Sequence, residues 1–285
     1  MAFSVLPQYD SALFETIHQA PTFLPSHEND ESVRIIVFVA ASITLFQLIM
    51  LQIVKAQLSK KNDEKSTSTA AWKASYQITN LVVNLTLGCL GIYYNLVLIP
   101  RGEEIRSKIL GYEHVKLFAL GQIGYQIWAL PVGFFFVGET TSMLIHHVAV
   151  ICVGSVSAFL SCGFRYFTPY FYGFIEISSV PLSVMNSFKN NPGWIKSYPE
   201  IYSSVRLIFG ISFLLVRVVF WTPIFWDFFS LASMLLLSSE NPVTKIILSL
   251  FNLSSLILTM LQYFWASKIV SAMFKGGGRK KAKRV

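Results

Sequence analysis

The sequence predicts an all-α, polytopic membrane protein of about seven transmembrane helices, and three observations lead to this fold class. Hydrophobic residues make up 53% of the 285 residues and charged residues only 13%, which is more apolar than is usual for a soluble domain of this length. Runs of about 20 mostly apolar residues, long enough for a helix to cross a bilayer, recur along the chain. The regular polar and apolar alternation of a membrane β-barrel is missing. Membrane-spanning α-helices are therefore the expected elements.

Seven segments have the length and composition of a transmembrane helix. They are residues 33–54, 75–99, 114–136, 140–161, 166–188, 201–223 and 243–269. The stretch from Trp221 to Leu237 leaves the number open between six, seven and eight. Its aromatic cluster contains Asp227, and this composition also fits a re-entrant or an interfacial helix.

The distribution of Lys and Arg predicts which side of the membrane each end of the chain faces. Residues 1–32 contain acidic residues but no Lys or Arg, whereas the loop before residue 71 and the tail 275–285 are basic. Cytosolic loops carry the excess of Lys and Arg in membrane proteins. We therefore expect a non-cytosolic N-terminal segment, a cytosolic first loop and a cytosolic tail. The net charge of +8 is then an orientation signal, and no nucleic-acid partner is expected.

Polar residues recur at helical spacing in five of the predicted spans, and the fourth span adds an adjacent pair of histidines. The clearest polar face, in the fifth span, contains Glu176, Ser179, Ser183 and Asn186. The other faces contain Tyr76, Asn80 and Asn84; Gln122, Tyr125 and Gln126; His146 and His147; Arg206 and Arg217; and Asn252, Ser255, Thr259 and Gln262. We expect six helices around a polar-lined cavity, with the first span (within residues 33–71) peripheral. Hydrogen bonding between helices is the alternative role for the Asn, Ser, Thr and Gln residues.

Ionisable groups at membrane depth are the strongest functional candidates. A charged side chain there costs on the order of 3 kcal/mol, so we expect Glu176 and Arg217 to face a wet cavity, a charged ligand or each other. The adjacent pair His146 and His147 points in directions about 100° apart on a helix, so the two imidazoles do not converge on one point. No metal site is expected from this spacing, and no cofactor is expected either.

These residues resemble a known family. His146-His147, followed about thirty residues later by Glu176-Ile177-Ser178-Ser179, Pro181 and Asn186, is similar to the TLC-domain family, which includes the ceramide synthases. The resemblance implies a TLC domain at residues 72–274, with a six-helix core around a lipid-sized cavity in an endoplasmic-reticulum membrane. Ceramide synthases have a His-Asp sequence and a second Asp after their His pair, where this chain has Ile175-Glu176 and then Ser179. In this respect the chain is more similar to TLC-domain proteins that are not synthases.

The resemblance implies two functions from different classes. The first is a lipid-binding protein that affects membrane lipid composition, with a sphingolipid-like lipid or a fatty acyl chain as its ligand. Its lipid-binding residues would be Asn84, Gln122, Ser179, Asn186, Arg217 and Gln262. The second is a ceramide synthase-like N-acyltransferase that joins a fatty acyl-CoA to a long-chain amine. His146 or His147 would then act on the amine or carry the acyl group, and Glu176 would orient the imidazole. A transporter has less support, because the sequence shows no inverted repeat of broken hydrophobic segments.

The last residues of the chain contain a second signal. Lys281 and Lys283 are followed by Arg284 and Val285, a pattern similar to the dilysine retrieval signals of endoplasmic-reticulum membrane proteins. Such a signal is read by a cytosolic coat protein, which is therefore an expected partner of the tail. The alternative is that these basic residues only anchor the orientation of the last span.

Overall fold

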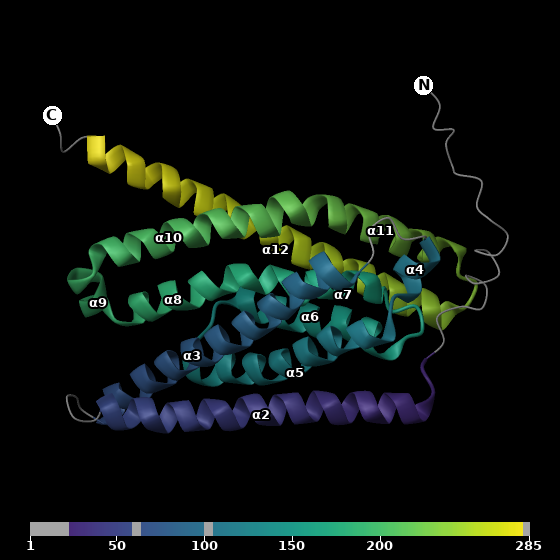
Figure 1. Cartoon of the computed structure of the whole chain (residues 1–285), viewed down its shortest axis with the longest axis horizontal. Helices are drawn as coiled ribbons and strands as arrows, with labels where there is room; N and C mark the ends of the chain where they lie inside the picture. The colour runs from purple at the N-terminus through teal and green to yellow at the C-terminus, as the bar shows by residue number, and fades with distance from the viewer. Residues whose placement is uncertain (1–22, 59–63, 100–104, 282–285) are drawn as a thin grey trace.

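The computed structural model describes residues 23–58, 64–99 and 105–281, and in this part of the chain the named elements are all helices. Long helices lie side by side along a common axis (Figure 1). Large apolar side chains such as Phe38, Phe135, Trp226 and Leu237 are exposed on the outside of the bundle. Such a surface is suited to lipid and not to water. The all-α, polytopic membrane fold predicted from the sequence is therefore confirmed.

Six helical segments among the described residues are long and apolar enough to cross a membrane. They are Ser26–Leu58 (α2), Thr67–Leu98, Ile105–Val137, Thr141–Phe159 (α6), Pro199–Ser238 and Pro242–Phe274. The second segment consists of α3 (Glu64–Tyr93) and the π-helix η1 (Tyr94–Leu98). The third consists of α4 (Ile105–Leu110), the 3-10 helix η2 (Glu113–Val115), α5 (Lys116–Val132) and the π-helix η3 (Gly133–Val137). Each of the six segments overlaps one of the predicted spans.

The predicted span 166–188 is different, because it is not one continuous helix. It consists of the 3-10 helix η4 (Arg165–Phe167), α7 (Thr168–Phe171), a second 3-10 helix η5 (Phe174–Ser178) and α8 (Ser179–Asn190). The break falls at Gly173, whose φ of −124° and ψ of −78° are not helical. Pro181 lies in the first turn of α8, where a backbone N–H has no partner within the helix. It therefore belongs to a helix start and not to a bend within a helix.

The segment from Trp221 to Leu237 extends the sixth span. The helix α10 (Pro199–Leu214) continues through the π-helix η6 (Leu215–Phe220) into α11 (Trp221–Ser238), so this segment is not a separate re-entrant piece and the predicted end at residue 223 is wrong. A helix of 40 residues is about 60 Å long, roughly twice the thickness of the hydrocarbon core. Part of it must therefore extend beyond the core.

The first described helix begins at one end of the bundle, and the last described helix finishes at the other. The helix α2 begins at one end and finishes at the other, where the short helix α9 (Pro192–Ser197) and the end of α12 (Pro242–Lys281) also lie (left in Figure 1). The helix α2 forms one side of the bundle and packs on α3 and α5. Gln47 of α2 is buried in this contact, where it donates to Ser75 Oγ (2.8 Å) and accepts from Thr79 Oγ1 (2.7 Å).

Candidate functional site

A cavity of about 410 Å³, here called the central cavity, lies inside the bundle. Its walls come from α3, α5, α6, η5, α8, α10, η6 and α12, and α2 supplies none of the described lining residues. The lining includes predicted polar residues from α3, α5, α6, η5, α8 and η6: Asn80, Asn84, Tyr125, Gln126, His146, His147, Glu176, Ser179, Ser183, Asn186 and Arg217. Six chain passes therefore surround a polar-lined cavity, as the sequence predicted.

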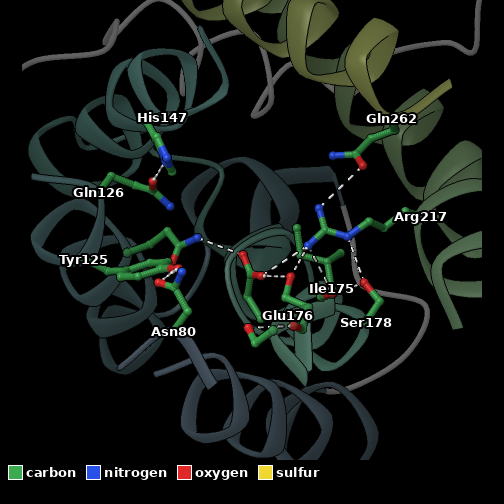
Figure 2. Close-up of polar contacts among 12 residues, drawn as sticks. Asn80, Tyr125, Gln126, His147, Ile175, Glu176, Ser178, Arg217 and Gln262 are labelled. Carbon is green, nitrogen blue, oxygen red and sulfur yellow. Dashed lines mark hydrogen bonds and ion pairs between the residues drawn. The ribbon is translucent and has the colours of Figure 1, made fainter. Parts of the chain in front are cut away.

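A buried ion pair forms one side of this cavity. Arg217 Nη2 lies 3.1 Å from Glu176 Oε2, and both side chains are almost completely buried. Ser179 Oγ donates to the same carboxylate oxygen (2.6 Å), and Gln122 Nε2 donates to Glu176 Oε1 (3.0 Å). Figure 2 shows Arg217 reaching across to Glu176 from the opposite wall. Each carboxylate oxygen thus has at least one donor, which offsets the cost of burying the charge.

The backbone around Glu176 is positioned by two glycines of α3. The Cα of Gly91 packs directly on Gly173, and a Cβ at residue 91 would lie 2.1 Å from Phe174 N. A Cβ on Gly88 would lie 2.9 Å from Ile177 N. These close approaches, one helical turn apart, need residues without side chains. They hold η5, and with it Glu176, against α3.

Arg217 lies in the π-helix η6 and is fixed by several acceptors. Its Nε donates to Ser178 Oγ (2.8 Å), and its Nη2 also contacts Ser179 Oγ (2.9 Å) and the carbonyl oxygen of Ile175 (3.3 Å). Its Nη1 has a longer contact of 3.4 Å to Gln262 Oε1 on α12 (Figure 2). One side chain therefore connects η6, η5 and α12. Short π-helical segments are frequent at functional sites.

The two histidines have different surroundings. His147 contacts Gln126 Oε1 through Nδ1, and its Nε2 lies 2.8 Å from Glu139 Oε2. The hydroxyl of Tyr76 donates to the other oxygen of Glu139 (2.8 Å). Both ring nitrogens of His147 are therefore occupied, and this imidazole has no nitrogen left for a ligand.

His146 is the less constrained histidine. Its ring packs edge-on against Trp265 with a centroid distance of 5.6 Å, and its Nδ1 is buried with no hydrogen-bond partner among the described residues. The side chain of His146 lines the central cavity and also a second space that adjoins it. Of the pair, His146 is thus the imidazole available to a molecule in the cavity.

Two more buried polar atoms on these walls lack partners within the described part of the chain. They are Asn84 Oδ1 and Gln122 Oε1, and with His146 Nδ1 they come from three different helices. A buried polar group without a partner costs about 1–3 kcal/mol. Three of them on the walls of two adjoining spaces are best explained by a polar ligand or water.

The second space is a small, apolar pocket of about 30 Å³ that adjoins the central cavity through His146 and Glu176. Aromatic side chains close it at the far end: Phe171, Trp221, Phe225 and Phe228. Gln122 and Gln262 line it near the polar layer. A molecule with a polar and an apolar part would therefore find complementary surroundings in the two spaces.

The structure places the predicted site residues close to one another, but Glu176 does not have the partner that was expected for it. The six predicted lipid-binding residues all line one of these two spaces, four of them the central cavity. Glu176, however, bonds to Arg217, Ser179 and Gln122, and the carboxylate beside an imidazole is that of Glu139. The expectation that Glu176 orients an imidazole does not fit this geometry.

Sequence reasoning missed several lining residues, of which Glu139 is the clearest. Glu139 follows Gly138, a residue with a φ of +73° that ends η3, and it looks like part of an ordinary loop. Its acidic charge between two apolar spans is the one available signal. Lys189 and Lys268 were missed because each lies at the end of a predicted span, where a basic residue is common.

The fold and the cavity define a class of protein, namely a polytopic helical membrane protein with a polar site inside its bundle. The sequence profile of the TLC domain matches residues 73–271, more than half of the chain. The chain therefore belongs to the TLC-domain family, whose members are associated with membrane lipids. No match was found among curated proteins or among solved structures.

Proposed function

We propose that this protein binds one membrane lipid in the central cavity and thereby affects membrane lipid composition. The observation that carries the proposal is the cavity of about 410 Å³, which is lined by the unpartnered Asn84 Oδ1 and His146 Nδ1, with the unpartnered Gln122 Oε1 on the adjoining apolar pocket. Its volume lies within the range of about 300–1,000 Å³ that is typical of ligand pockets. The polar groups would hold a headgroup, and the apolar pocket would take the start of a hydrocarbon chain.

Ligand extraction tests this proposal. Full-length protein purified in mild detergent should release about one lipid per chain on organic extraction, as measured by mass spectrometry. Ser183→Phe places a ring in the cavity and should reduce the bound lipid at least tenfold. Ser230→Phe makes the same change on the exposed surface and should have no effect. Equal amounts of lipid in the two variants would contradict a site in the cavity.

An N-acyltransferase like the ceramide synthases is the second candidate, and the free imidazole of His146 favours it. The nitrogen of a long-chain amine would attack the carbonyl carbon of an acyl-CoA thioester. The C–N bond forms, the C–S bond breaks, and CoA leaves as a thiolate. His146 would take the proton from the amine and pass it to that thiolate. The single Glu at position 176 argues for the binding function, because the synthases have an acidic pair in this region.

One assay separates the two functions. The purified protein is incubated with palmitoyl-CoA and sphinganine, and N-acyl product and free CoA are measured together. The binding function predicts no product above the heat-treated protein. Product that depends on His146, and is lost in His146→Ala, would instead establish the acyltransferase.

We also place the protein in the endoplasmic-reticulum membrane, with its tail in the cytosol. The family membership and the basic tail support this location. Lys283 lies outside the described residues, as does the rest of the segment 282–285. Replacement of Lys281 and Lys283 with Ser should release a fluorescently tagged protein to later compartments. Unchanged reticular staining would leave the tail as an anchor of orientation and would remove the coat protein as a partner.

A further inference from the structure

A further cavity, distinct from the apolar pocket and here called the basic groove, opens beside the central cavity between α8, α10 and α12. It has a volume of about 760 Å³, and each of the three helices contributes one cation to its wall: Lys189, Arg206 and Lys268. Met185, Phe209 and Ile269 line the basic groove and the central cavity together, as do Lys189 and Lys268. The two spaces therefore adjoin each other.

The charges along these two spaces do not balance. Both carboxylates of the central cavity have cationic or hydrogen-bonded partners, since Glu176 pairs with Arg217 and Glu139 contacts His147 and Tyr76. Lys189, Arg206 and Lys268, in contrast, have no carboxylate partner among the described side chains. The uncompensated charges of these two adjoining spaces are thus all positive.

Two of the three cations lie over aromatic rings. The guanidinium of Arg206 lies over the ring of Tyr202 at 5.7 Å, and the ammonium of Lys268 lies over Phe264 at 4.1 Å. Burial lowers the pKa of Lys189, and the positive charge of Arg206 lowers it further. Because like charges so close together repel, the arrangement gains stability when an anion lies between them.

We propose that the basic groove binds the phosphate group of a lipid that extends from there into the central cavity. This inference rests on the proposed lipid-binding function and names the chemical class of the ligand. Phosphate suits the site because it accepts hydrogen bonds on several oxygens and carries up to two negative charges. Met185 and Met273 provide an adaptable apolar wall beside it, which suits the part of the lipid next to the headgroup.

The experiment compares three probes on purified full-length protein in neutral detergent, with binding followed by tryptophan fluorescence. The probes are dioctanoyl phosphatidic acid, dioctanoylglycerol and inorganic phosphate. The first two have the same acyl chains and differ in the phosphate, and the third has the phosphate without the chains. Phosphatidic acid should bind at least tenfold more tightly than dioctanoylglycerol, and inorganic phosphate should compete with it only at far higher concentration.

Charge variants identify the site. The triple variant Lys189→Gln, Arg206→Gln and Lys268→Gln should weaken phosphatidic acid binding on the order of 100-fold, since each cation near a lipid surface contributes about a factor of five. The matched control, Arg34→Gln, Lys55→Gln and Lys245→Gln, removes the same charge from exposed positions outside the groove and should change binding less than twofold. Lys189→Arg with Lys268→Arg preserves the charge and should preserve binding, which separates loss of charge from loss of folding.

Each other result has a defined meaning. If the two triple variants lose the same affinity for phosphatidic acid, or if neither loses any, the basic groove is not the binding site. Equal affinity for phosphatidic acid and dioctanoylglycerol overturns the phosphate inference but leaves the proposed function standing, whereas failure of both lipids to bind overturns the proposed function. If inorganic phosphate binds as tightly as phosphatidic acid, and the groove variant abolishes this binding, the groove binds free phosphate and not a lipid phosphate.

Discussion

Arg217 Nη2 and Glu176 Oε2 lie 3.1 Å apart in the interior of the bundle, 41 residues apart in the sequence. The pair connects the π-helix η6 with the 3-10 helix η5. Both elements depart from α-helical geometry at the position where the charged residue enters the cavity. The irregular backbone is thus found where it lines a polar space, and this is where such backbone is tolerated at membrane depth.

Removing one member of this pair should destabilise the protein strongly. Arg217→Met leaves the carboxylate of Glu176 without its cation, and loss of one partner of a buried pair costs about 3–5 kcal/mol. The double variant Glu176→Gln with Arg217→Met should recover part of this loss, because no unpaired charge remains. Thermal unfolding in detergent, followed by size-exclusion chromatography, measures both. Arg206→Met, which breaks no ion pair, is the control, and a double variant less stable than Arg217→Met would contradict the prediction.

The two histidines should respond differently to substitution. His147→Ala removes the contacts to Gln126 and Glu139 and should lower the free energy of unfolding by about 1–3 kcal/mol. His146→Ala removes no hydrogen bond that the structure shows and should change stability less, while it alters the binding of a lipid in the cavity. Thermal unfolding and lipid extraction of both variants test this division. Equal destabilisation by the two changes would show that His146 has a structural role as well.

The contact between α3 and the segment before η5 should not tolerate a side chain. Gly91→Ala would place a Cβ 2.1 Å from Phe174 N, and such overpacking costs about 1–3 kcal/mol. Gly193→Ala in α9 is a matched control, because a Cβ there meets nothing within 4 Å. The first variant should lower the unfolding temperature and bind less lipid, since η5 carries Glu176. A Gly91→Ala protein as stable as the control would show that α3 and η5 can separate without cost.

Cysteine accessibility tests the predicted orientation. In a background where Cys89, Cys152 and Cys162 are Ala, a membrane-impermeant maleimide confined to the cytosol should label cysteines placed in residues 58–68 and in the tail. Cysteines placed in residues 5–25 should react only after the membrane is permeabilised. Labelling of both termini from the same side would contradict an odd number of membrane crossings.

Much of the fold could be predicted because its signals are local. A run of about 20 apolar residues identifies a spanning helix without knowledge of its neighbours, and helical spacing places Asn80 and Asn84 on one face of it. The same local reasoning failed for residues 166–188. There the close approach of Gly91 and Gly173 stabilises a broken backbone that the hydropathy of the segment does not reveal.

The sequence by itself determined the class of protein, the approximate positions of six long spans and many of the polar residues that line the cavity. The choice of partner was decided only by the tertiary structure: Glu176 with Arg217, Glu139 with His147, and Lys189 beside Arg206 and Lys268. The physical reason is that apolar length and periodicity depend on neighbours along the chain, whereas an ion pair or a basic groove depends on how helices distant in sequence pack. In the low-dielectric interior that packing decides which charges are compensated.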